Sequence, residues 1–211
     1  SKPITGAVSP PTKITVNGKE IELSALLEKW TAPLEKVFPT KAEVPEIEVD
    51  VPLYSERNTS SPAIKTAKPT VFIPVFPGTN CEVDTARAFE KAGANVEMLI
   101  VKNLSSNDIE ETIDEMEKLI AKSQMIMLPG GFSGGDEPDG SGKFIATTFR
   151  NPRIAEQVNN LLKNRDGLML GICNGFQALI KLGLVPYGEI RELKANDPTL
   201  TFNTIGRHIS H

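Results

Sequence analysis

The 211-residue chain has few cysteines and no excess of positive charge. The first feature excludes a disulfide-rich protein, and the second excludes a basic protein that binds nucleic acid. Its two cysteines, Cys81 and Cys173, lie far apart, which excludes a disulfide framework and favours free thiols in a reducing compartment. Lysine and arginine number 23 against 27 acidic residues, so the net charge of −4 gives no electrostatic footprint for nucleic acid or anionic lipid. No apolar run is long enough to span a membrane and no signal-peptide pattern occurs. We therefore expect a cytoplasmic protein with no nucleic-acid or membrane partner.

The first part of the chain divides into a small folded segment and a linker. Residues 13–23 alternate in polarity around Asn17-Gly18, which predicts a β-hairpin, and the apolar spacing that follows predicts a helix over 24–37. Prolines, acidic residues, serine and threonine are scattered through 41–69, as in an extended linker. We therefore expect a hairpin–helix segment within residues 1–40 and a proline-rich linker over 41–69.

From residue 70 onward, predicted strands alternate with predicted helices. The expected strands are residues 70–76, 95–101, 124–128 and 168–172. The helices between them include one that Asn107 is expected to cap. This alternation predicts right-handed βαβ units and an α/β fold, with a doubly wound, mostly parallel sheet covered on both faces. We expect residues 70–211 to form the N-terminal part of this domain, incomplete at its C-terminal end.

A single cysteine lies between the last of these strands and the helix that follows it. Residues 168–172 form a short apolar run of the kind that is buried inside a parallel sheet. Gly171 and Gly175 flank Cys173 at two residues on either side, which allows a sharp strand–nucleophile–helix turn that lifts the side chain off the end of the sheet. A thiol at a helix N-terminus lies at the positive end of the helix dipole, which favours the thiolate. We therefore predict that Cys173 is a nucleophile rather than an inert core cysteine.

A glycine-rich loop follows the expected strand at 124–128. The glycines of Pro129–Gly135 let the backbone approach a ligand closely and aim N–H groups at an anion. Together with the N–H of Asn174, which follows the nucleophile, they fit the oxyanion hole of an acyl-transfer enzyme. The next stretch, Gly135–Lys143, fails the spacing of a phosphate loop and of a calcium loop, so we interpret it as a solvated loop beside the pocket. Cys81 lacks the elbow pattern and is interpreted as a structural thiol.

Histidine is scarce as well. A thiolate nucleophile normally needs a base, for which the chain offers only His208 and His211. Neither is followed by an acidic residue two positions later, so we expect the working histidine to lie outside this chain. The chain also begins without methionine and ends soon after an apparent strand, and we therefore expect a fragment of a longer polypeptide.

The motif Gly171-Ile-Cys-Asn-Gly-Phe-Gln177 matches Gly-x-Cys-x-Gly-x-Gln and so resembles the nucleophile signature of class I glutamine amidotransferases. Pro77–Glu82, Gly130–Ser133 with Gly135-Asp136, and Asn203–Arg207 make the chain similar to the glutaminase domain of the phosphoribosylformylglycinamidine synthase family. Trp30–Thr40 resembles the end of the synthase portion in single-chain members of that family. The resemblance implies a flavodoxin-like fold for the glutaminase domain. It also implies that the chain spans the junction between the synthase and glutaminase portions.

The resemblance also implies roles for individual residues. Cys173 would attack the carboxamide of glutamine, form a γ-glutamyl thioester and release ammonia, while the backbone N–H groups of Gly131 and Asn174 hold the oxyanion. The implied substrate-binding residues are Gly130, Phe132, Gln177, Asn203 and Arg207.

The ammonia would serve purine biosynthesis in the synthase domain of the same polypeptide, where ATP and magnesium are expected. No metal or cofactor is expected in this chain. The family's histidine and glutamate, arranged His-x-Glu, are expected beyond His211, where this sequence stops, so little turnover is expected from the chain alone.

Two other functions fit parts of the same pattern. A cysteine hydrolase of the DJ-1-like group also uses an elbow cysteine, although Gln177 and the Gly130-Gly131 loop argue against it. A non-catalytic docking module of a larger synthase fits the missing histidine, whereas the intact elbow argues against it. Testing glutamine against small aldehydes or peptides separates glutaminase activity from the first alternative, and measuring glutamate release after the C-terminal residues are restored separates it from the second.

Overall fold

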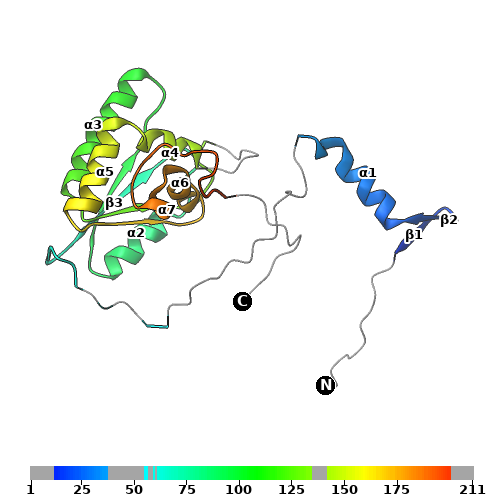
Figure 1. Cartoon of the computed structure of the whole chain (residues 1–211), viewed down its shortest axis with the longest axis horizontal. Helices are drawn as coiled ribbons and strands as arrows, with labels where there is room; N and C mark the ends of the chain where they lie inside the picture. Colours follow the sequence, from blue (N-terminus) through cyan, green and yellow to red (C-terminus); the bar gives the residue numbers. More distant parts are fainter. Residues whose placement is uncertain (1–11, 38–54, 57–58, 60, 135–141, 201–211) are drawn as a thin grey trace. The chain divides into compact units, whose positions relative to one another are not determined.

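The structure is a computed structural model that describes residues 12–37, 55–56, 59, 61–134 and 142–200 (Figure 1). These residues fall into two compact units, one before residue 38 and one after residue 54. The two units are described separately below. The boundaries expected at residues 40 and 69 stay predictions.

The first unit is a hairpin followed by one helix. Strand β1 (Lys13–Val16) pairs antiparallel with β2 (Lys19–Glu22) across Asn17 and Gly18, which both have positive φ, 51° and 76°. That pair of angles is the one that a two-residue hairpin turn requires. Helix α1 (Leu23–Glu35) follows directly. The hairpin and the helix predicted from the sequence are both confirmed.

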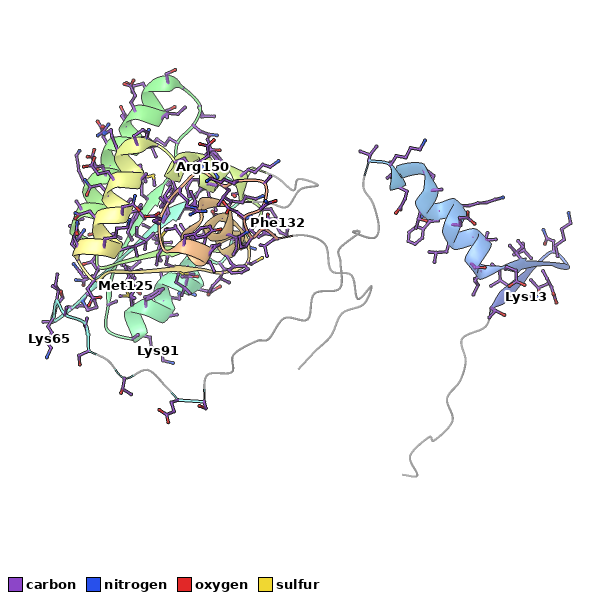
Figure 2. All side chains as sticks on the ribbon, in the orientation of Figure 1. Lys13, Lys65, Lys91, Met125, Phe132 and Arg150 are labelled. Carbon is purple, nitrogen blue, oxygen red and sulfur yellow. The ribbon has the colours of Figure 1, made fainter. Side chains whose placement is uncertain are left out.

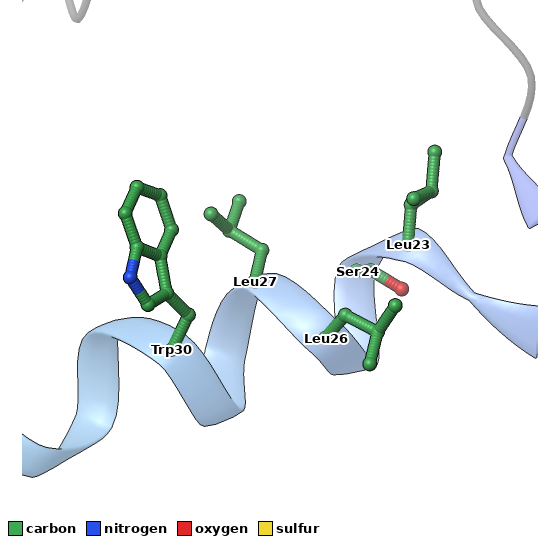
Figure 3. Close-up of a pocket in the computed structure, with 5 residues that line it drawn as sticks. All are labelled: Leu23, Ser24, Leu26, Leu27 and Trp30. Carbon is green, nitrogen blue, oxygen red and sulfur yellow. The ribbon is translucent and has the colours of Figure 1, made fainter.

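Helix α1 carries an apolar face that nothing in the described part of the first unit covers. Leu23, Leu27 and Trp30 project from the same side of the helix (Figure 3). The exposed fraction is 55% for Leu27 and 80% for Trp30, and no residue of α1 is buried. The described part of this unit therefore has no hydrophobic core.

The second unit alternates strands and helices as predicted. Its elements are β3 (Thr70–Val75), α2 (Glu82–Lys91), β4 (Asn95–Ile100), α3 (Ser106–Lys122), β5 (Met125–Leu128), α4 (Lys143–Phe149), α5 (Pro152–Asn164), β6 (Leu168–Gly171), α6 (Asn174–Leu182) and α7 (Leu184–Tyr187). All four strands pair in parallel, in the order β4-β3-β5-β6. Counted within the unit this order is 2-1-3-4, as in flavodoxin-like sheets, so the predicted α/β fold is confirmed. Nowhere in the described residues is a helix both long and apolar enough to cross a membrane.

The core of the unit lies mostly on one face of the sheet. Buried side chains of α3, α4, α5 and α6 surround Phe72 of β3 and Ile126 and Leu128 of β5. Helices α3 and α5 lie side by side over this face (Figure 1). On the opposite face, Ala86 of α2 packs against the central strands around Val71. Helices on both faces give the doubly wound arrangement that the sequence predicted.

The second face is covered less completely than expected. Helix α2 covers the central strands, but on β6 the exposed fractions of Leu168 and Leu170 are 65% and 49%, and on β4 that of Ile100 is 70%. Among the described residues β6 pairs only with β5 and is an edge strand. Helices lie on both faces as predicted, but the expectation of a buried strand before Cys173 is wrong, because the side chains of β6 alternate between exposed and half-buried.

Two local details also differ from the sequence-based expectations. The N-cap of α3 is Ser105, whose Oγ accepts a hydrogen bond from the backbone N–H of Asp108 at 3.1 Å. The expected cap, Asn107, instead donates from its side chain to Glu111 one turn later. Helix α4 was not predicted at all, because the apolar spacing of its seven residues is too short to establish a helical period.

The segment after α7 is held by one carboxylate. Asp197 accepts hydrogen bonds from the backbone N–H of Lys194 at 2.7 Å, from the Tyr187 hydroxyl at 2.6 Å and from the Arg191 guanidinium at 3.1 Å. That guanidinium also lies 3.4 Å from the centre of the Tyr187 ring. The Lys194 N–H, then the Tyr187 hydroxyl and Arg191, hold the pKa of Asp197 at about 2, below its ordinary 3.8.

We expect the Asp197→Asn variant to be less stable than the wild type at neutral pH and to lose that difference in acid. The folded chain lowers the pKa of this carboxyl, so its ionised form stabilises the fold above about pH 4, and the contribution disappears as the pH falls towards about 2. Thermal unfolding followed by circular dichroism across this range measures the effect. Exposed Glu192, replaced by glutamine, is the matched control on the same segment. An Asp197→Asn curve that stays parallel to the wild-type curve down to about pH 2 would contradict the assignment.

Candidate active site

Cys173 occupies the sharp turn between β6 and α6. Its backbone angles are φ 51° and ψ −108°, a combination that a residue with a side chain rarely adopts. The turn leaves the thiol exposed at the carboxyl end of β6, directly before the first turn of α6. The predicted elbow is therefore present, and the residue expected to be the nucleophile stands at its tip.

Glycine is required on both sides of this turn because the backbone approaches too closely for a side chain. A Cβ at Gly175 would lie 2.1 Å from the carbonyl oxygen of Leu128, and one at Gly171 would lie 2.6 Å from the backbone of Gly175. The Gly175 N–H also donates to the Pro129 carbonyl oxygen at 3.1 Å. The start of α6 therefore contacts the end of β5 backbone to backbone.

The glycine loop after β5 lies beside the nucleophile. A Cβ at Gly130 would be 3.4 Å from that of Cys173. Gly131 has φ +119°, and a Cβ there would lie 2.4 Å from the carbonyl oxygen of Gly78. The loop pairs with the turn after β3, because the Asn80 N–H donates to the Gly130 carbonyl at 2.9 Å and the Phe132 N–H donates to the Gly78 carbonyl at 2.8 Å. The turn after β3 and the glycine loop after β5 are thus joined through their backbones at the carboxyl edge of the sheet.

The N–H groups of this loop divide into two sets. Those of Phe132, Ser133 and Gly134 each donate to an acceptor of the protein. In the described residues no acceptor binds the N–H of Gly130 or Gly131. The loop residues next to Cys173 therefore keep two N–H groups without a protein acceptor in the described part of the chain. An oxyanion hole needs uncommitted donors of this kind close to the nucleophile.

The first turn of α6 carries a buried amide side chain that touches the loop. Asn174 is 1% exposed, and its Oδ1 accepts hydrogen bonds from the Ser133 hydroxyl at 2.7 Å and from the Ser133 N–H at 3.2 Å. Its Nδ2 donates to Gln177 Oε1 at 3.3 Å. The sequence predicted a role in the oxyanion hole for the backbone N–H of Asn174, but it predicted no role for its side chain or for Ser133. A contact between residues 41 positions apart leaves no signal in local spacing.

The other predicted site residues divide between the described and the undescribed parts of the chain. Phe132 is 59% exposed and lies at the surface of the second unit (Figure 2). Asn203 and Arg207, together with both histidines, lie outside the described residues, and so does most of the loop at 135–143. The described residues therefore bring together Cys173, the loop that carries Gly131, and the first turn of α6.

Cys81, interpreted from the sequence as a structural thiol, does not lie in the core. It is exposed, has φ 68° and directly precedes α2. Its backbone N–H donates to the side-chain oxygen of the preceding Asn80 at 2.8 Å. Among the described residues no group of three histidine, cysteine or acidic side chains could hold a metal ion.

Several known proteins resemble the chain. The subunit PurQ of phosphoribosylformylglycinamidine synthase from Dehalococcoides mccartyi is 37% identical over 131 residues, which cover 62% of this chain and 46% of the relative. The PurQ subunit of Methanococcus maripaludis is 38% identical over 134 residues, with 61% and 45% covered. A solved structure of PurLQS from Thermotoga maritima matches at 31% identity and a TM-score of 0.39, covering 56% of this chain and 45% of that one.

The extent of these matches decides what they establish. The chain spans less than half the length of these curated relatives. The match to a family as a whole is more extensive, because it runs over residues 68–211, well over half of the chain. It includes the glycine loop, the elbow and the helix that follows. On this match the chain belongs to the family of CobB/CobQ-like glutamine amidotransferase domains.

Proposed function

We propose that the chain is a glutaminase portion of phosphoribosylformylglycinamidine synthase, in which Cys173 releases ammonia from glutamine. The ammonia would then serve the ATP-dependent amidination of formylglycinamide ribonucleotide in purine biosynthesis, in the cytoplasm. The named PurQ relatives and the family match support this proposal. ATP and magnesium would act in the synthase portion, which is the proposed partner, and neither is needed for the thiol chemistry.

One observation carries the proposal: an exposed cysteine at the elbow lies beside a backbone N–H that has no acceptor among the described residues. Gly130 lies beside Cys173, since a Cβ added to it would be in van der Waals contact with the Cys173 Cβ at 3.4 Å, and Gly131 follows it directly. A thiol and a donor at this spacing suit acyl transfer, where a tetrahedral oxyanion forms next to the attacked carbon. A purely structural loop has no need of both features at one place.

The reaction would proceed in two balanced steps. The sulfur of Cys173 attacks the side-chain carbonyl carbon of glutamine, and the carbonyl electron pair moves to oxygen, where the N–H groups of Gly131 and Asn174 stabilise the charge. The intermediate then collapses, the carbon–nitrogen bond breaks, and the proton given up by the thiol goes to the departing nitrogen. This leaves ammonia and a γ-glutamyl thioester. Water adds to the thioester, which releases glutamate and restores the thiol.

The remaining predicted residues would hold the substrate. Gln177 lies on the first turn of α6 within hydrogen-bond distance of Asn174, and Phe132 is exposed on the adjoining loop. These side chains would contact the glutamine backbone or its aliphatic chain. Asn203 and Arg207 are proposed to complete the pocket, as the resemblance implies.

A chloroketone analogue of glutamine is expected to label Cys173 and not Cys81. Both thiols are exposed, so exposure alone does not distinguish them, whereas only Cys173 lies beside the proposed oxyanion donors. Peptide mass spectrometry identifies the modified residue. Cys173→Ser should abolish labelling, Cys81→Ser should retain it, and excess glutamine should slow it. Labelling that follows Cys81, or that glutamine does not slow, would refute the proposed function.

Gly131→Ala is expected to slow this labelling about 100-fold, because the new Cβ would collide with the Gly78 carbonyl and move the proposed donor. Gly93→Ala is the matched control, since Gly93 also has a positive φ but has nothing within 4 Å of an added Cβ. Both variants incur the same kind of backbone strain, roughly 1–2 kcal/mol. Equal labelling rates in the two variants would mean that the position of Gly131 does not matter to the reaction.

A further inference from the structure

We propose that Ser133 and the side chain of Asn174 are positioning residues that hold the Gly130–Gly131 backbone against the nucleophile. The inference rests on the proposed function and adds to it a role for two side chains. Neither residue is proposed to touch the substrate through its side chain. Their effect is exerted on the loop that carries the oxyanion donor.

The contact between the two side chains is buried and doubly hydrogen bonded. Ser133 is 3% exposed and Asn174 is 1% exposed. The Ser133 hydroxyl and the Ser133 N–H both donate to Asn174 Oδ1, at 2.7 and 3.2 Å. Breaking buried hydrogen bonds of this kind is costly, because water cannot replace them when the partners separate. The contact therefore fixes the distance between the loop and the first turn of α6.

The donors of Ser133 also determine which way the Asn174 carboxamide faces. A backbone N–H can only donate, so the group opposite it must be the oxygen and not the NH₂. Asn174 Nδ2 is then directed to Gln177, which presents Oε1 at 3.3 Å. One amide thus links the glycine loop to the side chain proposed to hold glutamine.

The loop is tied at both ends to the start of α6. At its beginning the Pro129 carbonyl accepts from the Gly175 N–H at 3.1 Å, and at its end Ser133 binds Asn174. Gly130 and Gly131 lie between these two ties, and glycine backbones are the most mobile when nothing holds them. Without the Ser133 tie, the loop end nearest the donor would depend on its pairing with the turn after β3 alone.

The expected consequence is specific to chemistry that forms an oxyanion. A donor displaced by about 1 Å costs about 100-fold in the rate of a step that depends on it. Direct displacement of iodide from iodoacetamide by the thiolate forms no oxyanion and needs no donor. A chloroketone first accepts the thiolate at its carbonyl carbon, which places a charge on oxygen, and then loses chloride as the thioether forms. The ratio of the two alkylation rates therefore measures donor placement.

We expect Ser133→Ala to slow labelling of Cys173 by the glutamine chloroketone by about 10- to 100-fold while iodoacetamide labelling stays within about twofold. Ser123→Ala is the matched control, because Ser123 is also fully buried and its hydroxyl donates to the Leu119 carbonyl at 2.7 Å, remote from the elbow. That variant should change neither rate. Circular dichroism of each variant separates a loss of fold from a loss of positioning.

A second variant tests whether the two residues act through one contact. Asn174→Ala removes the acceptor of both Ser133 donors, and the double variant should then lose no more than Asn174→Ala alone. Losses that multiply in the double variant would overturn the inference, and so would equal slowing of both reagents or an unchanged ratio. A wild-type chain that does not react preferentially with the chloroketone would overturn the proposed function, and the inference with it.

Discussion

The arrangement of the site depends on one backbone contact, between Gly175 and the end of β5. The amide of Gly175 meets the Pro129 carbonyl, and its Cα stands so near the Leu128 carbonyl that any side chain would collide with it. Helix α6 can therefore begin directly on the sheet. This forces Cys173 into a strained turn that exposes its thiol, and it buries Asn174 one residue later against the neighbouring loop.

The same edge of the sheet is built almost entirely from backbone. The turn after β3 and the glycine loop after β5 bind each other through peptide groups, and glycine at 78 and 131 allows the approach. Such pairing places N–H groups rigidly without committing side chains to the task, which is the preorganisation that stabilises a developing charge. Three of the N–H groups in the loop satisfy acceptors of the protein. The two N–H groups before them, of Gly130 and Gly131, have no acceptor among the described residues and are the ones proposed to meet an oxyanion.

Much of this was predictable from the sequence, and the failures have physical causes. Glycines two residues on either side of Cys173 have few explanations other than a sharp turn, and the alternation of strands and helices led correctly to a parallel sheet. An apolar run of four residues is the same in an edge strand as in an interior one, so the exposure of Leu168 could not be foreseen. Ser105 and Asn107 are both good helix caps, and only the geometry of the loop selects Ser105.

The geometry and the family match support different parts of the functional proposal. Backbone N–H groups beside a thiol stabilise any tetrahedral oxyanion, whether it comes from an amide, an ester or a thioester. Selection of glutamine has to come from side chains that bind its charged end, and Gln177 is a polar side chain on the first turn of α6, directly after the elbow. The substrate class is therefore supported by the match over residues 68–211, while the reaction type is supported by the elbow. The side chain of Asn174 connects the two parts of the proposal, because this single buried carboxamide accepts hydrogen bonds from Ser133 of the glycine loop and donates one to Gln177 on the first turn of α6.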